Sequence, residues 1–217
     1  MASEQIENYL KNIYKLQADE GRVTTSSLSQ RLQISAASVS EMIRKLADEG
    51  CVTYTPYKGV ELTAEGRRRA LRIVRRHRLW ELFLVEVLKY DWDEIDEEAE
   101  RLEHSTSERL EQRIDEILGY PERDPHGDVI PTPEGKIHES GHQPLSEVRP
   151  GTTVLVSRVN DSNPEILQYM SKLGIALSTK IKVKEKIGFD GSLRIEVGRK
   201  KQYISAKLAQ NIFVAER

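Results

Sequence analysis

The order of apolar patterns in the first 62 residues constrains the fold of this chain more than any other feature. Apolar side chains recur at helical spacing over residues 6–16, 24–32 and 39–46, and a tight connection separates the last two stretches. Residues 51–54 and 60–62 are short β-favouring stretches on either side of a turn rich in Pro and Gly. Two short helices followed by a hairpin predict a winged helix-turn-helix, a fold that binds duplex DNA.

Beyond the hairpin the pattern stays helical for some 55 residues and then changes to short strands. A long helix is predicted from Thr63 to about Val87, and a second from about Asp93 to Leu118. The predicted buried positions of the second helix are Ile95, Ala99, Leu102, Leu110, Ile114 and Ile117. Residues 120–143, rich in Pro, Gly and His, are predicted to be a linker. The short strands that follow are predicted at 153–159, 181–187, 193–197 and 203–205, with a helix near 164–173. The fold class is therefore mainly α with a small β-barrel domain.

Charge is distributed unevenly, although the formal net charge is only −2. Residues 1–78 hold 14 Lys and Arg against 9 Asp and Glu, residues 79–147 hold 6 against 20, and residues 148–217 hold 13 against 6. This alternation indicates a polyanionic partner for the first segment and cations for the second.

Composition excludes several classes of protein. No apolar run is long enough to span a bilayer, and the single cysteine, Cys51, cannot form an internal disulfide. A membrane protein and a secreted disulfide scaffold are therefore excluded, and a cytoplasmic protein is expected.

The predicted second helix of the helix-turn-helix carries the candidate DNA contacts. Its N-terminal residues would lie at base edges in the major groove, where hydroxyls reach phosphates or bases and Ala methyls meet thymine methyls. The candidates are Ser35, Ala36, Ala37, Ser38, Ser40 and Glu41, with Arg44 one turn further on and Tyr57 and Lys58 at the tip of the wing.

Two helices carry candidate metal ligands. Glu100, Glu103 and His104 stand at i, i+3 and i+4, which places two carboxylates and an imidazole on one helical face. His77 and Glu81 form an i, i+4 pair on the preceding helix, and the two sets could meet if these helices pack antiparallel. Oxygen and imidazole donors without a thiolate favour Mn²⁺ or Fe²⁺, although zinc would tolerate the same set.

A second motif predicts different chemistry. His138-Glu139-Ser140-Gly141-His142 matches the H-E-x-x-H pattern of zinc proteases, which requires both histidines on one face of a stable helix. Pro131, Pro133, Gly135 and Pro144 surround this stretch and disfavour such a helix. A zinc metallohydrolase through residues 138–142 is therefore the weaker alternative.

Several motifs together resemble one family, the diphtheria-toxin-repressor family of metal-dependent transcriptional regulators, over nearly the whole chain. The motifs are Glu7-Asn8-Tyr9-Leu10-Lys11-Asn12-Ile13-Tyr14, Ser38-Val39-Ser40-Glu41-Met42, Arg76-His77-Arg78-Leu79, Glu97-Glu98-Ala99-Glu100-Arg101-Leu102-Glu103-His104 and Pro125-His126-Gly127-Asp128. The resemblance implies a winged helix-turn-helix domain (1–73), a helical dimerisation and metal-binding domain with its linker (74–143) and an SH3-like domain of the ferrous-transport-A type (144–217). It further implies a homodimer that binds operator DNA when loaded with Mn²⁺ or Fe²⁺ and usually represses metal-uptake genes.

The resemblance also implies two metal sites. The first draws on Glu100, Glu103 and His104 together with Asn8. The second draws on His77 and Glu81 and, in the long manganese-type branch that this chain looks most like, on Asp124, His126 and Asp161. The family usually has Asp or Met at the position of Asn8 and often Cys at that of Asp124, and Glu100 stands where the iron-type branch carries Cys, which favours Mn²⁺.

Two further alternatives concern the effector. The first is an Fe²⁺-sensing repressor of iron uptake. The second is a winged-helix regulator that senses a small organic ligand instead of a metal.

Overall fold

The computed structural model describes residues 2–55, 59–137 and 141–216. The chain divides into two compact units. The first comprises residues 1–80, 99–117 and 130–138, and the second comprises residues 81–98, 118–129 and 139–217.

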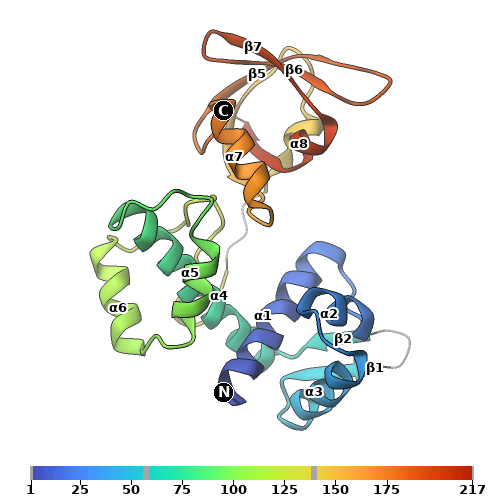
Figure 1. Ribbon diagram of the computed structural model, residues 1–217, viewed down its shortest axis with the longest axis vertical. Coiled ribbons are helices and arrows are strands. Elements are labelled where there is room, and N and C mark those ends of the chain that lie inside the picture. The colour runs from blue at the N-terminus through green and yellow to red at the C-terminus, as the bar shows by residue number, and fades with distance from the viewer. Residues whose placement is uncertain (1, 56–58, 138–140, 217) are drawn as a thin grey trace. The chain divides into compact units, whose positions relative to one another are not determined.

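The first unit begins with the predicted winged helix-turn-helix (Figure 1). Its elements are α1 (Ala2–Glu20), α2 (Thr25–Leu32), α3 (Ala36–Asp48), β1 (Val52–Thr55) and β2 (Gly59–Leu62). Thr24 and Ser27 form a reciprocal capping box at the start of α2, and the Ser35 side chain accepts a hydrogen bond from the Ser38 backbone at the start of α3. The Ser35 cap lies at the tight turn between the two helices, whereas the Thr24 cap fixes the start of α2.

The core of this region joins the three helices to the hairpin. Leu10, Ile13, Leu28 and Leu46 are fully buried in it. The β2 strand also pairs with Val23 at an isolated bridge, and a Cβ at Gly59, whose φ is +104°, would lie 2.2 Å from the Val23 carbonyl oxygen. Glycine is required there because both the close approach and the positive φ exclude a side chain.

Three helices follow the hairpin: α4 (Ala64–Glu86), α5 (Asp96–Glu103) and α6 (Glu108–Ile117). The prediction of one helix over 93–118 is wrong, because the helix is interrupted after Glu103. The Thr106 hydroxyl donates to the Leu102 carbonyl, and the Ser107 hydroxyl accepts from the Leu110 backbone N–H at the start of α6. Ser and Thr side chains compete with helical hydrogen bonds in this way and favour helix ends.

The break changes which side chains are covered. Ile95, Ala99 and Ile114 are buried as predicted, but Leu110 is 42% and Ile117 65% exposed in the single chain. The prediction that these two residues are buried is therefore wrong for the isolated protomer. Two large aliphatic side chains seven positions apart on α6 leave an apolar strip uncovered.

The second unit contains a six-stranded antiparallel sheet in the order β3-β8-β4-β5-β6-β7. Figure 1 labels β5, β6 and β7 of this sheet, with α7 and α8. Its elements are β3 (Gln143–Pro144), the 3₁₀ turn η1 (Leu145–Glu147), β4 (Thr153–Val159), α7 (Pro164–Lys172), β5 (Lys180–Lys186), β6 (Leu193–Val197), β7 (Lys200–Ile204), α8 (Ala206–Gln210) and β8 (Ile212–Glu216). The predicted small β domain is confirmed and has an SH3-like architecture. The β8 strand, which pairs with both β3 and β4, was not among the predicted strands.

Residues 123–129, within the predicted linker, form an ordered turn. Arg123 and Val129 pair across it, and the Asp124 Oδ1 accepts hydrogen bonds of 2.9 Å from the backbone N–H groups of His126 and Asp128. Within the described part of the chain, no helix is both long enough and apolar enough to cross a membrane.

Candidate metal centre

The first cluster of candidate ligands lies between α4 and α5. His77 comes from α4, and Glu100 and Glu103 come from one face of α5. The His77 Nδ1 lies 2.6 Å from Glu103 Oε2 and 3.9 Å from Glu100 Oε2. Ligand atoms of the three residues all fall within 4.8 Å of one another, so they could hold one metal ion. His77 is 3% and Glu103 0% exposed, whereas the Glu100 side chain is 42% exposed, so the cluster is open to solvent at Glu100.

A lysine from α1 contacts the same carboxylates. The Lys11 Nζ lies 2.5 Å from Glu100 Oε2 and 2.5 Å from Glu103 Oε1. Burial alone would raise the pKa of the Glu103 carboxyl, but the hydrogen bond with His77 and the charge of Lys11 outweigh it and hold that pKa below its usual range. The carboxylate pair is thus built to face positive charge.

His104, the residue after α5, contacts α1. Its Nδ1 lies 2.8 Å from Glu7 Oε2, and its Nε2 lies 2.8 Å from Asn8 Oδ1 and 3.3 Å from Glu103 Oε1. The hydrogen bond to Glu7 raises the pKa of His104, against the effect of burial. Both ring nitrogens therefore donate to oxygen atoms when the ring is protonated.

The second cluster belongs to the second unit and comprises Glu81, His126 and Asp161. The His126 Nδ1 lies 3.8 Å from Glu81 Oε1 and 3.9 Å from Asp161 Oδ2, too far for hydrogen bonds. This nitrogen is buried and has no hydrogen-bond partner among the described residues. Burial disfavours a charged ring, but Glu81, Asp124 and Asp161 outweigh it and raise the pKa of His126.

The surroundings of His126 fix the orientation of its ring. The His126 Nε2 lies 2.8 Å from the Trp92 carbonyl oxygen, and the two rings stack with centroids 5.8 Å apart. When Nε2–H donates to that carbonyl, Nδ1 presents its lone pair to Glu81 and Asp161. A histidine that ligates a metal commonly donates its other N–H to a backbone carbonyl in this manner.

Gly127 brings the turn against β4. A Cβ on Gly127, whose φ is +90°, would lie 2.2 Å from the Ser157 carbonyl oxygen, and the Val159 N–H donates to the His126 carbonyl at 2.9 Å. Only glycine allows this approach, which places His126 beside the strand that leads to Asp161.

Both clusters fit a hard divalent cation. The first presents two carboxylates and an imidazole, and those carboxylates already hold an ammonium group. The second presents the buried His126 Nδ1 between two carboxylate oxygens. Neither includes a thiolate, because the free Cys51 is buried in the core of the winged domain. Oxygen and imidazole donors of this kind suit Mn²⁺ and Fe²⁺.

The structure brings some of the predicted ligands together and places others in different contacts. Glu81, His126 and Asp161 are brought together, as are His77, Glu100 and Glu103. Asn8 and His104 contact each other beside the first cluster, whereas Asp124 uses its Oδ1 to cap the 124–128 turn. Glu7 and Lys11 also contact these residues and were not among the predicted site residues, although they lie one helical turn apart on α1 and next to Asn8 in the helical net.

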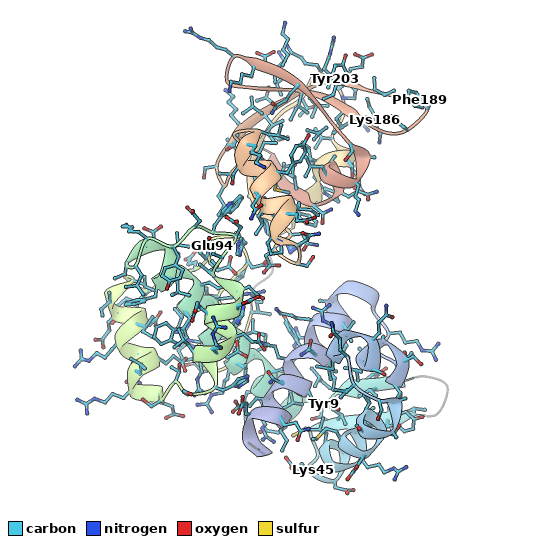
Figure 2. The ribbon with its side chains drawn as sticks, viewed as in Figure 1. Tyr9, Lys45, Glu94, Lys186, Phe189 and Tyr203 are labelled. Carbon is cyan, nitrogen blue, oxygen red and sulfur yellow. The ribbon has the colours of Figure 1, made fainter. Side chains whose placement is uncertain are left out.

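The predicted DNA contacts on α3 form an outward-facing surface. Ser35, Ala36, Ala37, Ser38, Glu41 and Arg44 are exposed, and Ser40 is half-buried. Val39, Met42, Ile43 and Leu46 on the opposite face are buried. Lys45 extends from the same helix (Figure 2) and is also exposed. Ser35 also caps the helix, because its hydroxyl oxygen accepts a hydrogen bond of 3.1 Å from the Ser38 backbone N–H.

Some predicted residues lie outside the described part of the chain. These are Tyr57 and Lys58 at the wing, and residues 138–140 of the H-E-x-x-H motif. His142, the last residue of that motif, has its Nδ1 2.8 Å from the Ser157 hydroxyl oxygen. Burial and the charges of Arg123 and Arg158 lower the pKa of His142.

Family models match three consecutive parts of the chain. The N-terminal DNA-binding domain of iron-dependent repressors matches residues 1–60, and their metal-binding and dimerisation domain matches residues 63–132. The FeoA domain matches residues 143–216.

Curated relatives and solved structures agree with these matches. The chain is 32% identical to the diphtheria toxin repressor of Corynebacterium efficiens over 189 residues, which covers 82% of this chain and 81% of that protein. It is 29% identical to that of Corynebacterium glutamicum over 188 residues, or 82% of each chain. A manganese-dependent transcriptional repressor in complex with manganese aligns with a TM-score of 0.89 and 40% identity, covering 98% of this chain and all of that one. The manganese regulator SloR aligns with a TM-score of 0.79 and 33% identity, covering 98% of both chains.

These relatives are repressors and favour no hydrolase, so the zinc metallohydrolase alternative is not supported. The winged helix-turn-helix, the clusters of carboxylates and imidazoles and the SH3-like domain occur in the order of the three family models. The chain therefore belongs to the diphtheria toxin repressor family of iron- and manganese-dependent transcriptional repressors, which bind DNA and are not enzymes.

Proposed function

We propose that this protein is a Mn²⁺-responsive repressor that binds double-stranded operator DNA as a homodimer. The observation that carries the choice of metal is the second cluster, where the buried His126 Nδ1 faces two carboxylate oxygens. The donor set there and at Glu100 and Glu103 contains no sulfur, which favours Mn²⁺ over softer ions. Fe²⁺ is the alternative effector, because it accepts the same donors.

The ligands of the first site come from the elements that carry the winged domain. The residues that would hold the ion are His77, Glu100 and Glu103, with Asn8 and His104 beside them. Glu7 and Asn8 lie on α1, whose opposite face supplies Leu10 and Ile13 to the core around α2 and α3. A bound ion would supply positive charge between the carboxylates of Glu100 and Glu103 on α5, beside Asn8 on α1. By fixing α1 against α5, the ion would favour the arrangement that binds DNA, and metal affinity and DNA affinity would then be linked.

The exposed face of α3 is the proposed DNA-reading surface. Ser35, Ala36, Ala37, Ser38, Ser40 and Glu41 would approach base edges, and Arg44 would contact a phosphate, with Tyr57 and Lys58 contributing from the wing. A homodimer presents two copies of this face, so the expected operator is an inverted repeat with half-sites about one helical turn or a multiple of it apart.

A metal-dependent gel shift tests this function. The metal-stripped full chain is incubated with its own upstream DNA and with Mn²⁺, Fe²⁺ under anaerobic conditions, Zn²⁺ or Co²⁺. We expect Mn²⁺ to raise operator affinity at least tenfold. Equal retardation of the DNA by the metal-stripped and the Mn²⁺-loaded protein would overturn the proposal. A response to Fe²⁺ alone would show that Fe²⁺, and not Mn²⁺, is the effector.

Two variants connect that response to the proposed ligands. Glu103→Gln should abolish the Mn²⁺ response, while Glu94→Gln, which changes an exposed carboxylate outside both clusters (Figure 2), should leave it intact. Asp161→Ala should remove one Mn²⁺ per chain in isothermal titration calorimetry. An unchanged metal stoichiometry would exclude Asp161 as a ligand.

A further inference from the structure

Lys11 is a charged side chain in a place where lysine is rarely found. It is only 2% exposed, and it reaches across from α1 to two carboxylates on α5. Lysine is almost never fully buried unless it is paired, because removing an ammonium group from water is costly. Here the pairing is double, with both Nζ–O distances at 2.5 Å. Lys11 therefore belongs to the first cluster, although an ammonium group cannot ligate a metal.

The atoms that Lys11 contacts are ligand atoms of the proposed first site. Glu100 and Glu103, together with His77, form the group whose ligand atoms lie within 4.8 Å of one another. The ammonium donates to Glu100 Oε2 and Glu103 Oε1. A divalent ion that bound the same two carboxylates would meet a positive charge at contact distance, and like charges at that distance repel each other. The ammonium and the metal therefore compete for one pair of carboxylates.

We propose that Lys11 is an internal cation that occupies the first metal site in the metal-free protein and sets the metal concentration needed to load it. Loading requires the ammonium to leave Glu100 and Glu103. The competition lowers the affinity of the site for any divalent ion, so the protein responds at a higher metal concentration than its carboxylates alone would allow. This inference rests on the proposed function, because it takes Glu100 and Glu103 as ligands.

The second cluster provides the comparison within the same chain. There the group that faces two carboxylates is the His126 Nδ1, which is itself a metal ligand when neutral. The group that faces the carboxylates there can therefore stay as a ligand when that cluster is loaded. Lys11 thus affects the first site selectively.

The test is Mn²⁺ binding to the metal-stripped full chain by isothermal titration calorimetry, in an Asp161→Ala background that disables the second cluster. Lys11→Met removes the charge and keeps an unbranched side chain. Lys15→Met is the matched control, since it removes the same charge one turn along α1, at a residue outside the groups that could hold a metal. We expect Lys11→Met to bind Mn²⁺ at least tenfold more tightly than the background protein, and Lys15→Met to stay within threefold of it. Equal or weaker binding by Lys11→Met would overturn the inference.

A failure of the proposed site itself gives a different result. If Glu103→Gln binds Mn²⁺ as tightly as the background protein, Glu103 is not a ligand, and the first site and the Lys11 inference are both wrong. If Glu103→Gln loses binding and Lys11→Met gains none, the site is correct and Lys11 does not compete.

A second measurement needs no substitution and so holds even if Lys11→Met fails to fold. Lysine acetylation of the unsubstituted chain, read residue by residue by mass spectrometry, should show Lys11 protected in the metal-free protein. Saturating Mn²⁺ should raise its modification rate at least fivefold relative to that of Lys15. An unchanged ratio at saturation would mean that the ammonium stays in place, and the inference would be refuted.

Discussion

Arg75 is expected to stabilise the first unit more than any exposed charge in it. Its side chain is 6% exposed and makes three contacts: Nε with Glu111 at 3.0 Å, Nη2 with Asp115 at 2.6 Å and Nη1 with the Pro131 carbonyl oxygen at 2.8 Å. These contacts tie α4 to α6 and to the 130–137 segment, two residues before His77 on α4. Arg75→Met keeps most of the aliphatic stem and removes all three contacts.

The size of the effect follows from what each partner retains. Removing one member of a buried ion pair costs about 3–5 kcal/mol, because the other charge stays buried. Glu111 keeps a second ion pair with Arg76 at 2.9 Å, whereas Asp115, 13% exposed, loses its pair with Arg75. We therefore expect a loss near the lower end, about 3 kcal/mol. For a chain of this length that corresponds to a fall in Tm of roughly 6–12 °C.

The assay is urea unfolding in EDTA at fixed protein concentration. Trp80, whose Nε1–H donates to the Thr106 hydroxyl in the first unit, is followed by fluorescence in a Trp92→Phe background. Arg113→Met is the control, because its 66% exposed side chain pairs with Glu116 on the same helix and should cost less than about 1 kcal/mol. Arg75→Met/Asp115→Leu should recover more than about 1 kcal/mol of the loss, since it removes the carboxylate left unpaired. Equal losses for Arg75→Met and Arg113→Met would refute the reasoning.

Three shorter predictions concern DNA affinity, assembly and pH. Arg44→Ala should reduce the magnitude of the slope of log K against log salt for operator binding by about 1.8 per dimer, because each of the two lost phosphate contacts accounts for about 0.9. Fluorescence anisotropy across a salt series measures this slope, and an unchanged slope would exclude a phosphate contact. Ile117→Glu should shift the dimer toward monomer in analytical ultracentrifugation, because it charges a side chain that is 65% exposed in one protomer; a persistent dimer would place the interface elsewhere. Because the pKa of His142 is lowered in the folded protein, the unfolded chain binds a proton at His142 before the folded chain does as pH falls. The free energy of unfolding therefore decreases as pH falls below about 6.5. Proton NMR should find the His142 midpoint below that value, and a midpoint above it would contradict the prediction.

Local patterns were sufficient for the winged helix-turn-helix. Helical apolar stripes and short β-favouring stretches each act over only a few residues, and the structure confirms the helices and the paired strands that they predict. The same holds for the spacing of Glu100 and Glu103, because residues three apart on a helix share a face wherever that helix packs. The break between α5 and α6 was missed, since the hydroxyls of Thr106 and Ser107 interrupt an apolar pattern that otherwise continues.

The patterns along the chain did not predict which side chains surround the carboxylates of Glu100 and Glu103. Lys11 reaches Glu100 and Glu103 across 89 and 92 positions, and His126 faces Glu81 and Asp161 from a turn held against β4 by Gly127. Periodicity reports which face of an element is apolar, but it carries no information on which distant element packs there. The order of the elements and the types of ligand were therefore readable in the chain. The ammonium group within the first cluster and the ring nitrogen directed into the second depend on packing between distant segments.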